Sequence, residues 1–377
     1  MNLYQKYRPT IFSEVVGHEK VIKELQKRSK ENSFPQVIYL TGESGVGKTT
    51  IARIIAKSII CENKDDEGNP CNECDFCKDI LEEQFTLATR EYNSSNLNID
   101  AIREIASDAV RGSIFVNKKV FFIDELQELF SNKKAQKNLL KILEEETPYC
   151  HFILGSMDDS KVDKAIRNRS VMYRLDEIDY KAIGKYLYEI CQKEKIELNQ
   201  DQATILLDVA ENSYGSLRTA IAYLERVIGS DLWDRESLVK DLGIVTEEKL
   251  VEYTQLLLEG DSDIFKYYIT KDIAEKIRSM IVTTYKQKLG YEGNFFQRAV
   301  SKNLKKYPIE LLNIVLDQFN EIYKYPYITK ELMDYFLIQI IKTVLEETKR
   351  LKTPDQQSKK VDENSNASFL RRKPVEA

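Results

Sequence analysis

A chain of 377 residues can form two or three domains, and its 42% of hydrophobic residues is ordinary for a globular protein. No apolar run approaches the ~20 residues of a membrane span, and residues 1–12 lack the apolar core of a signal peptide. We therefore expect a cytoplasmic protein without a membrane partner. The formal net charge of −5 gives no general basic field, which argues weakly against a histone-like binder of nucleic acid and leaves a local basic stripe open.

The first part of the chain alternates short apolar runs with helical patterns. Three continuous apolar runs predict buried strands, at 36–41, 119–124 and 150–156. Helical patterns lie between them, at 48–60, 99–110 and 133–146. Buried strands that alternate with helices are typical of a parallel sheet covered by helices on both faces, so we predict an α/β domain at 1–177.

From about residue 178 onward the strand patterns stop, and apolar residues recur at i, i+3 and i+4, as in amphipathic helices. We predict a small helical domain at 178–242 and a larger all-α domain at 243–351. The apolar stripes of such helices usually pack against one another inside their own domain. The last segment, 352–377, is polar and is predicted to be a disordered tail.

The sequence GESGVGKT follows the first predicted strand and opens the next helix, so it fits the phosphate-loop pattern G-x-x-x-x-G-K-[ST] in its proper context. Backbone N–H groups would bind phosphate oxygens, Lys48 would add charge at the β- and γ-phosphates, and Thr49 would offer its hydroxyl to Mg²⁺. The correct flanks disfavour the alternative of a chance glycine turn. The predicted nucleotide-binding residues here are Gly42, Glu43, Ser44, Gly45, Val46, Gly47, Lys48, Thr49 and Thr50.

An acidic pair ends the predicted strand at 119–124. In P-loop ATPases an aspartate in the place of Asp124 orients Mg²⁺, and a glutamate in the place of Glu125 can polarise the attacking water as a general base. An Asp-Glu pair in isolation is more often a solvated turn. At the carboxyl end of a buried parallel strand, where ligands bind, the catalytic interpretation is favoured.

Four of the six cysteines are concentrated in one short segment, 61–77. In a reducing compartment clustered cysteines are more often metal ligands than disulfides. Four thiolates at ~2.3 Å from Zn²⁺ would form a closed structural site without an open coordination position. A redox C-x-x-C pair or simply buried cysteines are the alternatives. The predicted zinc ligands are Cys61, Cys71, Cys74 and Cys77.

Together these motifs resemble the AAA+ ATPases, and in detail the gamma/tau subunits of the bacterial DNA polymerase III clamp loader. The segment YQKYRPTIFSEVVGHEKVIKEL (4–25) is similar to the opening of that family, and NLLKILEEET (138–147) is similar to its Asn-Ala-Leu-Leu-Lys-Thr-Leu-Glu-Glu-Pro run. The family also carries a zinc-binding insertion with the spacing C-x9-C-x2-C-x2-C, which 61–77 reproduces. The resemblance is dense over 4–226 and fades after that.

The resemblance implies two further catalytic arginines. Arg169, in IRNRSVMYRL, would be the arginine finger that acts on the nucleotide of a neighbouring subunit, although both flanks of the family's Ser-Arg-Cys motif differ here. A solvated surface arginine is the alternative, and Arg167 is a nearby competitor. Arg218, in YGSLRTAIAYLE, would be the sensor-2 arginine that contacts the γ-phosphate, unless it merely starts a helix.

For the adenine base, the resemblance implies contacts from Tyr7, Arg8 and Pro9 and from the turn that contains Val16 and Gly17. Their flat and apolar groups can enclose a base, but they could equally serve only to start the fold.

The clearest departure from the family is at sensor 1, where Gly155-Ser156-Met157 replaces Ala-Thr-Thr. Methionine cannot position water, so Met157 puts the hydrolysis rate in doubt, and Ser156 is the candidate substitute. Gln127 stands where the family usually has histidine, and with two histidines in the chain no histidine-based catalysis is expected. These departures would suit a diverged, phage-encoded member, and the sequence leaves a cellular or viral origin open.

The resemblance implies an ATPase that works as a clamp-loader motor subunit with ATP, Mg²⁺ and structural Zn²⁺. It would join other clamp-loader subunits in a pentamer-like spiral through a collar at 243–351, with 178–242 as the lid, and would load a sliding clamp on primer–template DNA. One alternative is another AAA+ DNA motor of the branch-migration type, against which the cysteine insertion argues. The other is a weakly hydrolysing structural ATP-binding subunit of the replisome, which Met157 favours.

Overall fold

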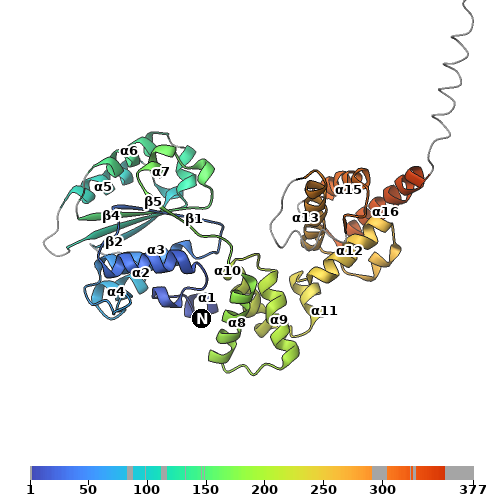
Figure 1. Cartoon of the computed structure of the whole chain (residues 1–377), viewed down its shortest axis with the longest axis horizontal. Coiled ribbons are helices and arrows are strands. Elements are labelled where there is room, and N and C mark those ends of the chain that lie inside the picture. Colours follow the sequence, from blue (N-terminus) through green and yellow to red (C-terminus); the bar gives the residue numbers. More distant parts are fainter. Residues whose placement is uncertain are drawn as a thin grey trace, which may run out of the picture. The chain divides into compact units, whose positions relative to one another are not determined.

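The computed structural model describes residues 2–82, 88–97, 99–111, 117–131, 133–145, 147, 149–290, 304–322, 324–325 and 328–352. It divides into two compact units, Met1–Asp234 and Arg235–Ala377 (Figure 1). The predicted tail at 352–377 lies outside the described residues, except for its first residue. The predicted division into separate α/β, lid and collar domains stays a prediction.

The first unit is built on a parallel five-stranded sheet with the strand order β2-β3-β4-β1-β5. The strands are β1 (Val37–Thr41), β2 (Thr89–Asn93), β3 (Lys119–Asp124), β4 (Cys150–Ser156) and β5 (Val171–Arg174). The parallel α/β sheet is thus confirmed, with β3 and β4 at the predicted residues. Sequence analysis missed β2 and β5, because these edge strands are only partly buried and lack a continuous apolar run.

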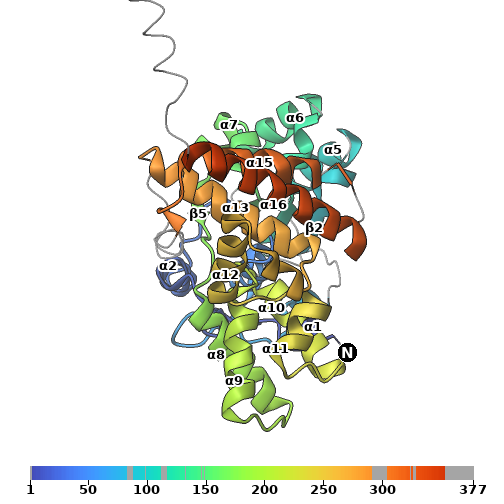
Figure 2. The ribbon, with the colours of Figure 1, turned by 90° about the vertical axis from the view of Figure 1, so that its right-hand side faces the viewer.

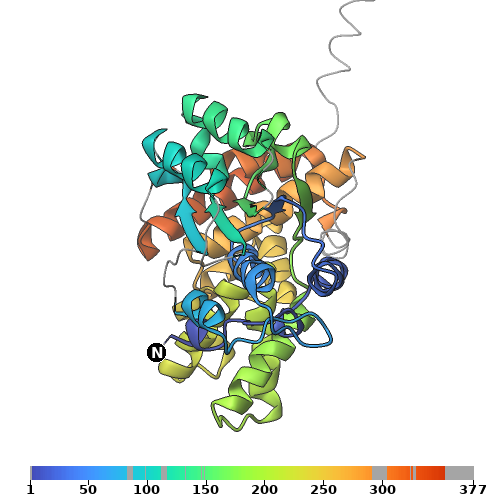
Figure 3. The same cartoon turned by 90° about the vertical axis from the view of Figure 1, so that its left-hand side faces the viewer.

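Helices cover both faces of this sheet, as Figures 1 and 3 show. On one face lie α5 (Ile99–Val110), α6 (Lys133–Glu144) and α7 (Lys164–Asn168); on the other lie α2 (Glu19–Lys30) and α3 (Lys48–Ile60). Side chains of β3 alternate between the two cores: Phe121 packs with the first group of helices and Phe122 with the second.

The strand register gathers polar residues at the carboxyl edge of the sheet. Thr41 of β1 pairs with Ser156 of β4, and Asn93 of β2 pairs with Asp124 of β3. Because the strands are parallel, their carboxyl ends lie side by side, and ligands bind at this edge in open α/β sheets. The phosphate-loop sequence leaves β1 at the same edge.

Three helices complete the first unit after the sheet: α8 (Tyr180–Lys193), α9 (Gln200–Glu211) and α10 (Leu217–Gly229). Each begins at a polar capping side chain that accepts a hydrogen bond from a free backbone N–H of the first turn. These caps are Asp179, Asn199 and Ser216. The short helix α1 (Leu3–Lys6) lies against α10, which brings the start of the chain to the last helix of this group.

The second unit is helical in its described part (Figure 2). Its described helices are α11 (Arg235–Ser237), a π-helical turn at Leu238–Leu242, α12 (Glu247–Glu259), a 3₁₀ helix at Ser262–Lys266, α13 (Lys271–Lys288), α15 (Ile309–Ile322) and α16 (Lys330–Lys352). Leu257, Ile277, Phe319 and Val344 are buried in one shared core, so much of the apolar face of each long helix packs inside the unit. Among the described residues, no helix is both long enough and apolar enough for a membrane crossing.

Candidate nucleotide site and cysteine module

The phosphate-loop sequence forms a tight turn between β1 and α3, which begins at Lys48. Gly45 and Gly47 have φ of 82° and 107°, in the left-handed region that favours glycine. A Cβ on Gly45 would lie 2.0 Å from Ser216 Oγ, so the loop can approach the start of α10 only because this residue has no side chain. The loop is therefore shaped both by its own backbone and by α10.

Lys48 points back along the loop. Its side chain is buried, and Nζ donates hydrogen bonds of 2.8 Å to the carbonyl oxygens of Gly42 and Glu43. Burial lowers the pKa of Lys48, while the nearby Asp124 carboxylate opposes this shift. An ammonium group that is partly desolvated and donates to neutral carbonyls is well placed to bind an anion such as phosphate.

The side chains of Thr49 and Asp124 are in contact next to Lys48. Thr49 Oγ1 donates a 2.7 Å hydrogen bond to Asp124 Oδ2, and Asp124 Oδ1 accepts the backbone N–H of Glu125 at 2.8 Å. A Cβ on Gly155 would lie 2.5 Å from Asp124 Oδ1, so the glycine of β4 makes room for this carboxylate. A hydroxyl and a carboxylate in contact are the ligand types that Mg²⁺ prefers.

Glu125 follows with a left-handed backbone, at φ of 54°, which turns its side chain toward β2. There Asn93 Nδ2 donates a 3.0 Å hydrogen bond to Glu125 Oε2. Sequence analysis missed Asn93, because β2 carries no apolar pattern. The signal that could have found it is its place at the carboxyl end of the strand next to β3.

A single cavity of the first unit brings most of the predicted site residues together. It is lined by Tyr4, Tyr7, Arg8, Pro9, Val15, Val16, Ser44, Gly45, Val46, Gly47, Lys48, Thr49, Thr50, Ile51, Asp124, Glu125, Met157, Ile178, Leu217, Arg218 and Ile221. Predicted residues outside this lining are Gly17, Gly42, Glu43, Ser156 and Arg169. Sequence analysis missed Tyr4 and the apolar side chains Ile51, Ile178, Leu217 and Ile221.

Tyr4 joins two of the cavity's arginines. Its ring centroid lies 5.8 Å from the guanidinium of Arg8 and 5.2 Å from that of Arg218, and its hydroxyl accepts a 3.3 Å hydrogen bond from Arg218. Such cation–π contacts are worth about 0.5–1 kcal/mol at exposed sites. Arg8 Nε also donates to Thr50 Oγ1 at 3.1 Å, so this end of the cavity is assembled from α1, α3 and α10.

At sensor 1 the serine and the methionine face different ways. Ser156 is fully buried and donates a 2.9 Å hydrogen bond to Gln127 Oε1, which also accepts the backbone N–H of Met157 at 3.1 Å. The side chain of Met157 is 40% exposed and lines the cavity. The sensor-1 side chain that lines the cavity is therefore that of Met157. The role of Ser156 as a nucleotide contact stays a prediction.

Arg169 lies at the end of α7. Its guanidinium forms a 2.6 Å ion pair with Glu144, the last residue of α6, and donates a 3.0 Å hydrogen bond to the carbonyl of Ala165. An arginine finger that acts on a neighbouring subunit has no reason to line the cavity of its own chain. The finger role stays a prediction, and Glu144 is a partner that sequence analysis did not identify.

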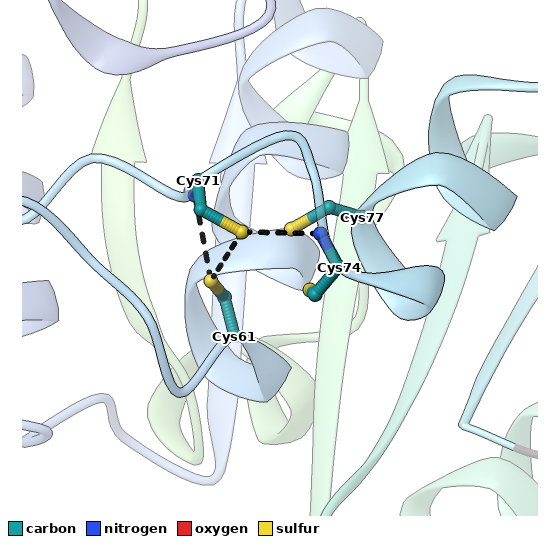
Figure 4. A group of neighbouring side chains, drawn as sticks. All are labelled: Cys61, Cys71, Cys74 and Cys77. Carbon is teal, nitrogen blue, oxygen red and sulfur yellow. Dashed lines mark hydrogen bonds between the residues drawn. The ribbon is translucent and has the colours of Figure 1, made fainter.

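The cysteine module, 61–77, closes on itself with its four sulfur atoms together (Figure 4). Cys61 directly follows α3, Cys71 and Cys74 lie in the loop after it, and Cys77 lies in α4 (Asp75–Leu81). All four are free thiols whose Sγ atoms lie within 4.8 Å of one another. Zn–S bonds of about 2.3 Å put the sulfurs of a tetrahedral site about 3.8 Å apart, so this set fits Zn²⁺.

The surroundings of Cys71 favour the thiolate form of its side chain. Burial alone would raise the pKa of its thiol, but the backbone N–H groups of Cys74 and Glu73 and the neighbouring thiols lower it to about 7. These N–H groups donate to its sulfur at 3.3 and 3.4 Å, as they would to a metal-bound thiolate.

Comparisons with known proteins place the chain among replication proteins. Residues 17–179 match the family described as "DNA polymerase III, delta subunit", and residues 185–227 match the "RCF1/5-like, AAA+ ATPase lid domain". The chain is 32% identical to DNA polymerase III subunit gamma/tau of Mycoplasma genitalium over 68% of this chain and 43% of that protein. It is 30% identical to DNA polymerase III subunit gamma of Buchnera aphidicola over 69% of this chain and 71% of that protein. The chain therefore spans less than half of the Mycoplasma protein.

Solved structures give more distant similarities. The Thermotoga maritima RuvB Holliday junction branch migration motor is 17% identical, with a TM-score of 0.47 over 81% of this chain and 91% of that chain. The Bacillus subtilis DNA clamp loader delta protein is 15% identical, with a TM-score of 0.40 over 85% of this chain and 99% of that chain. Similarity at this level gives no information on function.

Proposed function

Because the chain belongs to the family of the DNA polymerase III gamma and tau subunits, which has an AAA+ fold, we propose that it is an ATP-hydrolysing motor subunit of a clamp loader. ATP would bind with Mg²⁺ in the cavity of the first unit. Binding would order a spiral of subunits that opens a sliding clamp and grips primer–template DNA, and hydrolysis would release both.

One observation carries the catalytic part of this proposal. The hydroxyl of Thr49 and the carboxylate of Asp124 are in contact at 2.7 Å beside the buried Lys48, at the carboxyl edge of the parallel sheet. This arrangement would put a phosphate-binding lysine next to a pair of Mg²⁺ ligands, which a phosphoryl-transfer enzyme requires.

Each remaining residue has a part in this scheme. Lys48 would exchange its two carbonyl partners for phosphate oxygens, and Mg²⁺, held by Thr49 and Asp124, would neutralise charge on the phosphates. Glu125 would polarise the attacking water once it leaves Asn93. Arg218 would contact the γ-phosphate, and Tyr4 would hold its guanidinium in position.

The residues around these catalytic groups would serve adenine binding and assembly. Tyr7, Arg8, Pro9 and Val16 line the cavity and would contact the base. Arg169 would act on the nucleotide of the next subunit in the spiral. The four cysteines would hold structural Zn²⁺, and the helices of the second unit would form the collar that joins the subunits.

A weakly hydrolysing structural subunit is the second candidate, and a specific observation favours it. The side chain at the sensor-1 end of the cavity is Met157, whereas the polar Ser156 is buried against Gln127. A thioether is at best a weak acceptor and cannot position water. Nucleotide binding would then serve only to order the assembly.

The experiment is to reconstitute the chain with sliding clamp and partner subunits, and to measure clamp opening and ATP hydrolysis on primer–template DNA. We expect ATP-dependent opening by the wild type. Glu125→Gln should bind ATP but hydrolyse it about 100-fold more slowly, because general bases contribute roughly 10²–10⁴-fold.

Two other outcomes are informative. Equal hydrolysis rates for the wild type and Glu125→Gln, with clamp opening retained, would support the structural subunit. No clamp opening at saturating ATP would contradict the clamp-loader proposal altogether.

A further inference from the structure

The cysteine module lies directly against the part of the chain that lines the nucleotide cavity. We define the N-terminal segment as residues 3–14, which includes α1 and the 3₁₀ turn Phe12–Glu14. Tyr4, Tyr7, Arg8 and Pro9 of this segment line the cavity. The next residue, Thr10, contacts the cysteine module, so one short stretch of backbone separates the two sites.

Lys57 joins the N-terminal segment to the module. It lies on α3, one helix turn before Cys61, and is only 1% exposed. Its Nζ donates to the carbonyl oxygen of Thr10 and, at 2.6 Å, to Asn72 Oδ1. Asn72 Nδ2 in turn donates to Thr10 Oγ1 at 3.0 Å, which closes a ring of three hydrogen bonds.

On the side of the cysteine module, Asn72 and its turn hold this ring of hydrogen bonds in place. A buried ammonium needs acceptors, and those it has here come from the N-terminal segment and from Asn72. Asn72 lies between Cys71 and Cys74 with φ of 59°, a left-handed conformation that asparagine adopts more readily than most residues. A metal that binds both cysteines would therefore fix the turn that presents the Asn72 amide.

The module has a second contact with the segment. The backbone N–H of Ser13 donates to Asn69 Oδ1 at 3.4 Å, and Asn69 is buried. The module is in turn packed on α2, where Ser29 Oγ donates to the carbonyl of Gly68 at 2.6 Å and a Cβ on Gly68 would lie 2.7 Å from the carbonyl of Gln26. The segment thus rests on a support that is itself anchored to the α/β core.

At its other end the N-terminal segment reaches the helices that follow the sheet. Glu194, at the end of α8, accepts hydrogen bonds from Lys6 Nζ at 2.6 Å and from the Tyr7 hydroxyl at 2.7 Å. Tyr4 contacts Arg218 of α10, as described above. The segment therefore links the cysteine module to the arginine expected at the γ-phosphate.

We propose that the metal-bound cysteine module supports the nucleotide site, with Lys57 and Asn72 as positioning residues that hold the N-terminal segment in its ATP-binding conformation. The proposal rests on the ATP binding and zinc binding proposed above. Loss of the metal would free the Asn72 turn and weaken ATP binding. Because coupling between two sites is reciprocal, bound ATP would slow release of the metal.

The first test is the rate at which a coloured chelator removes zinc from the full chain, with and without a non-hydrolysable ATP analogue. In the wild type we expect the analogue to slow release at least about fivefold, the lower end of typical couplings. Asn72→Gly should lose this protection, because glycine keeps the left-handed turn without strain but has no side-chain amide to bind Lys57 and Thr10. Asn63→Gly, at an exposed position of the same module, should keep it.

The second test separates positioning from general stability. Zinc-loaded Asn72→Gly and Lys57→Met should bind ATP about fivefold to tenfold more weakly, raising KM while kcat at saturating ATP stays within about twofold. Amide hydrogen exchange over residues 3–14 should become faster in both variants and stay at the wild-type rate in Asn63→Gly.

The outcomes distinguish the two proposals. Wild-type ATP affinity in zinc-loaded Asn72→Gly and Lys57→Met, or zinc release from the wild type that ATP does not slow, would overturn the coupling and leave the ATPase proposal standing. A wild-type chain that binds zinc but no ATP would overturn the proposed function, and the coupling with it.

Discussion

Two parts of the nucleotide cavity are built in different ways. At the phosphate end, Lys48 is buried, and the key contacts lie between the phosphate loop, α3 and the carboxyl end of β3. In the other part, Tyr4, Arg8 and Arg218 meet through half-buried or exposed side chains that come from the start of the chain and from α10, about 200 residues apart. We call the first part the preformed end, because one sheet and the loop that follows its first strand hold its groups in place, and we call the second part the assembled end.

This difference predicts how substitutions will act. Changes at the preformed end remove a charge or a ligand that nothing else can replace, so their effects should be large. Changes at the assembled end remove one of several modest contacts, so they should tune affinity rather than abolish it.

The largest effect is expected for Lys48→Ala. Loss of the buried ammonium should weaken ATP binding about 100-fold or more, because a buried charged partner is worth about 2–5 kcal/mol. Isothermal calorimetry with ATP and Mg²⁺ measures this directly. Lys20→Ala, at an exposed position of α2, is the control and should bind as the wild type. A loss below tenfold at Lys48 would mean that the phosphate end is not preformed.

A smaller effect is expected where the preformed end meets β2. Asn93→Ala removes the 3.0 Å hydrogen bond that holds Glu125, so the carboxylate can turn to the attacking water more easily. We expect the basal ATPase rate to rise about twofold to tenfold, as for one hydrogen bond of about 0.5–1.5 kcal/mol. ATP affinity should stay unchanged. A slower enzyme would show instead that Asn93 aligns Glu125 for catalysis.

At the assembled end, Tyr4→Ala should weaken ATP binding about twofold to fivefold, because it removes the cation–π contact that positions Arg218, worth about 0.5–1 kcal/mol. Tyr4→Phe keeps the ring and should stay close to the wild type. Fluorescence titration with a labelled ATP can compare the two. Tighter binding by Tyr4→Ala would show that Tyr4 holds Arg218 away from the nucleotide.

The smallest effect concerns Glu194, which joins the N-terminal segment to α8. Hydrogen bonds from Lys6 and then from Tyr7 lower the pKa of this carboxyl, so the contact is fully formed above the usual glutamate pKa of about 4.3 and is lost as the pH falls through the lowered value. Glu194→Gln should change ATP affinity at pH 7 by less than about twofold, since exposed ion pairs contribute little. Hydrogen exchange over residues 3–14, measured as a function of pH in the wild type and in Glu194→Gln, tests whether the contact is lost in this pH range.

The same difference explains what could be predicted from the sequence. The phosphate loop, β3 with Asp124, and α3 were predicted with their boundaries, because local pattern and backbone geometry determine them. Asn93 was missed, since it lies on an edge strand whose sequence TREYN has no apolar run. Tyr4 was missed because only the fold brings it to Arg218.

The ion pair between Arg169 and Glu144 has a consequence for assembly. In the isolated chain this guanidinium already has a carboxylate partner, so the surface around it carries less positive charge than the sequence suggests. A neighbouring subunit with an empty nucleotide site would present no anion that could replace Glu144 as the partner of Arg169. One that holds a triphosphate would offer a stronger anion, and Arg169 could change partners. If Arg169 is the finger, Glu144 would make subunit docking selective for neighbours that are already loaded.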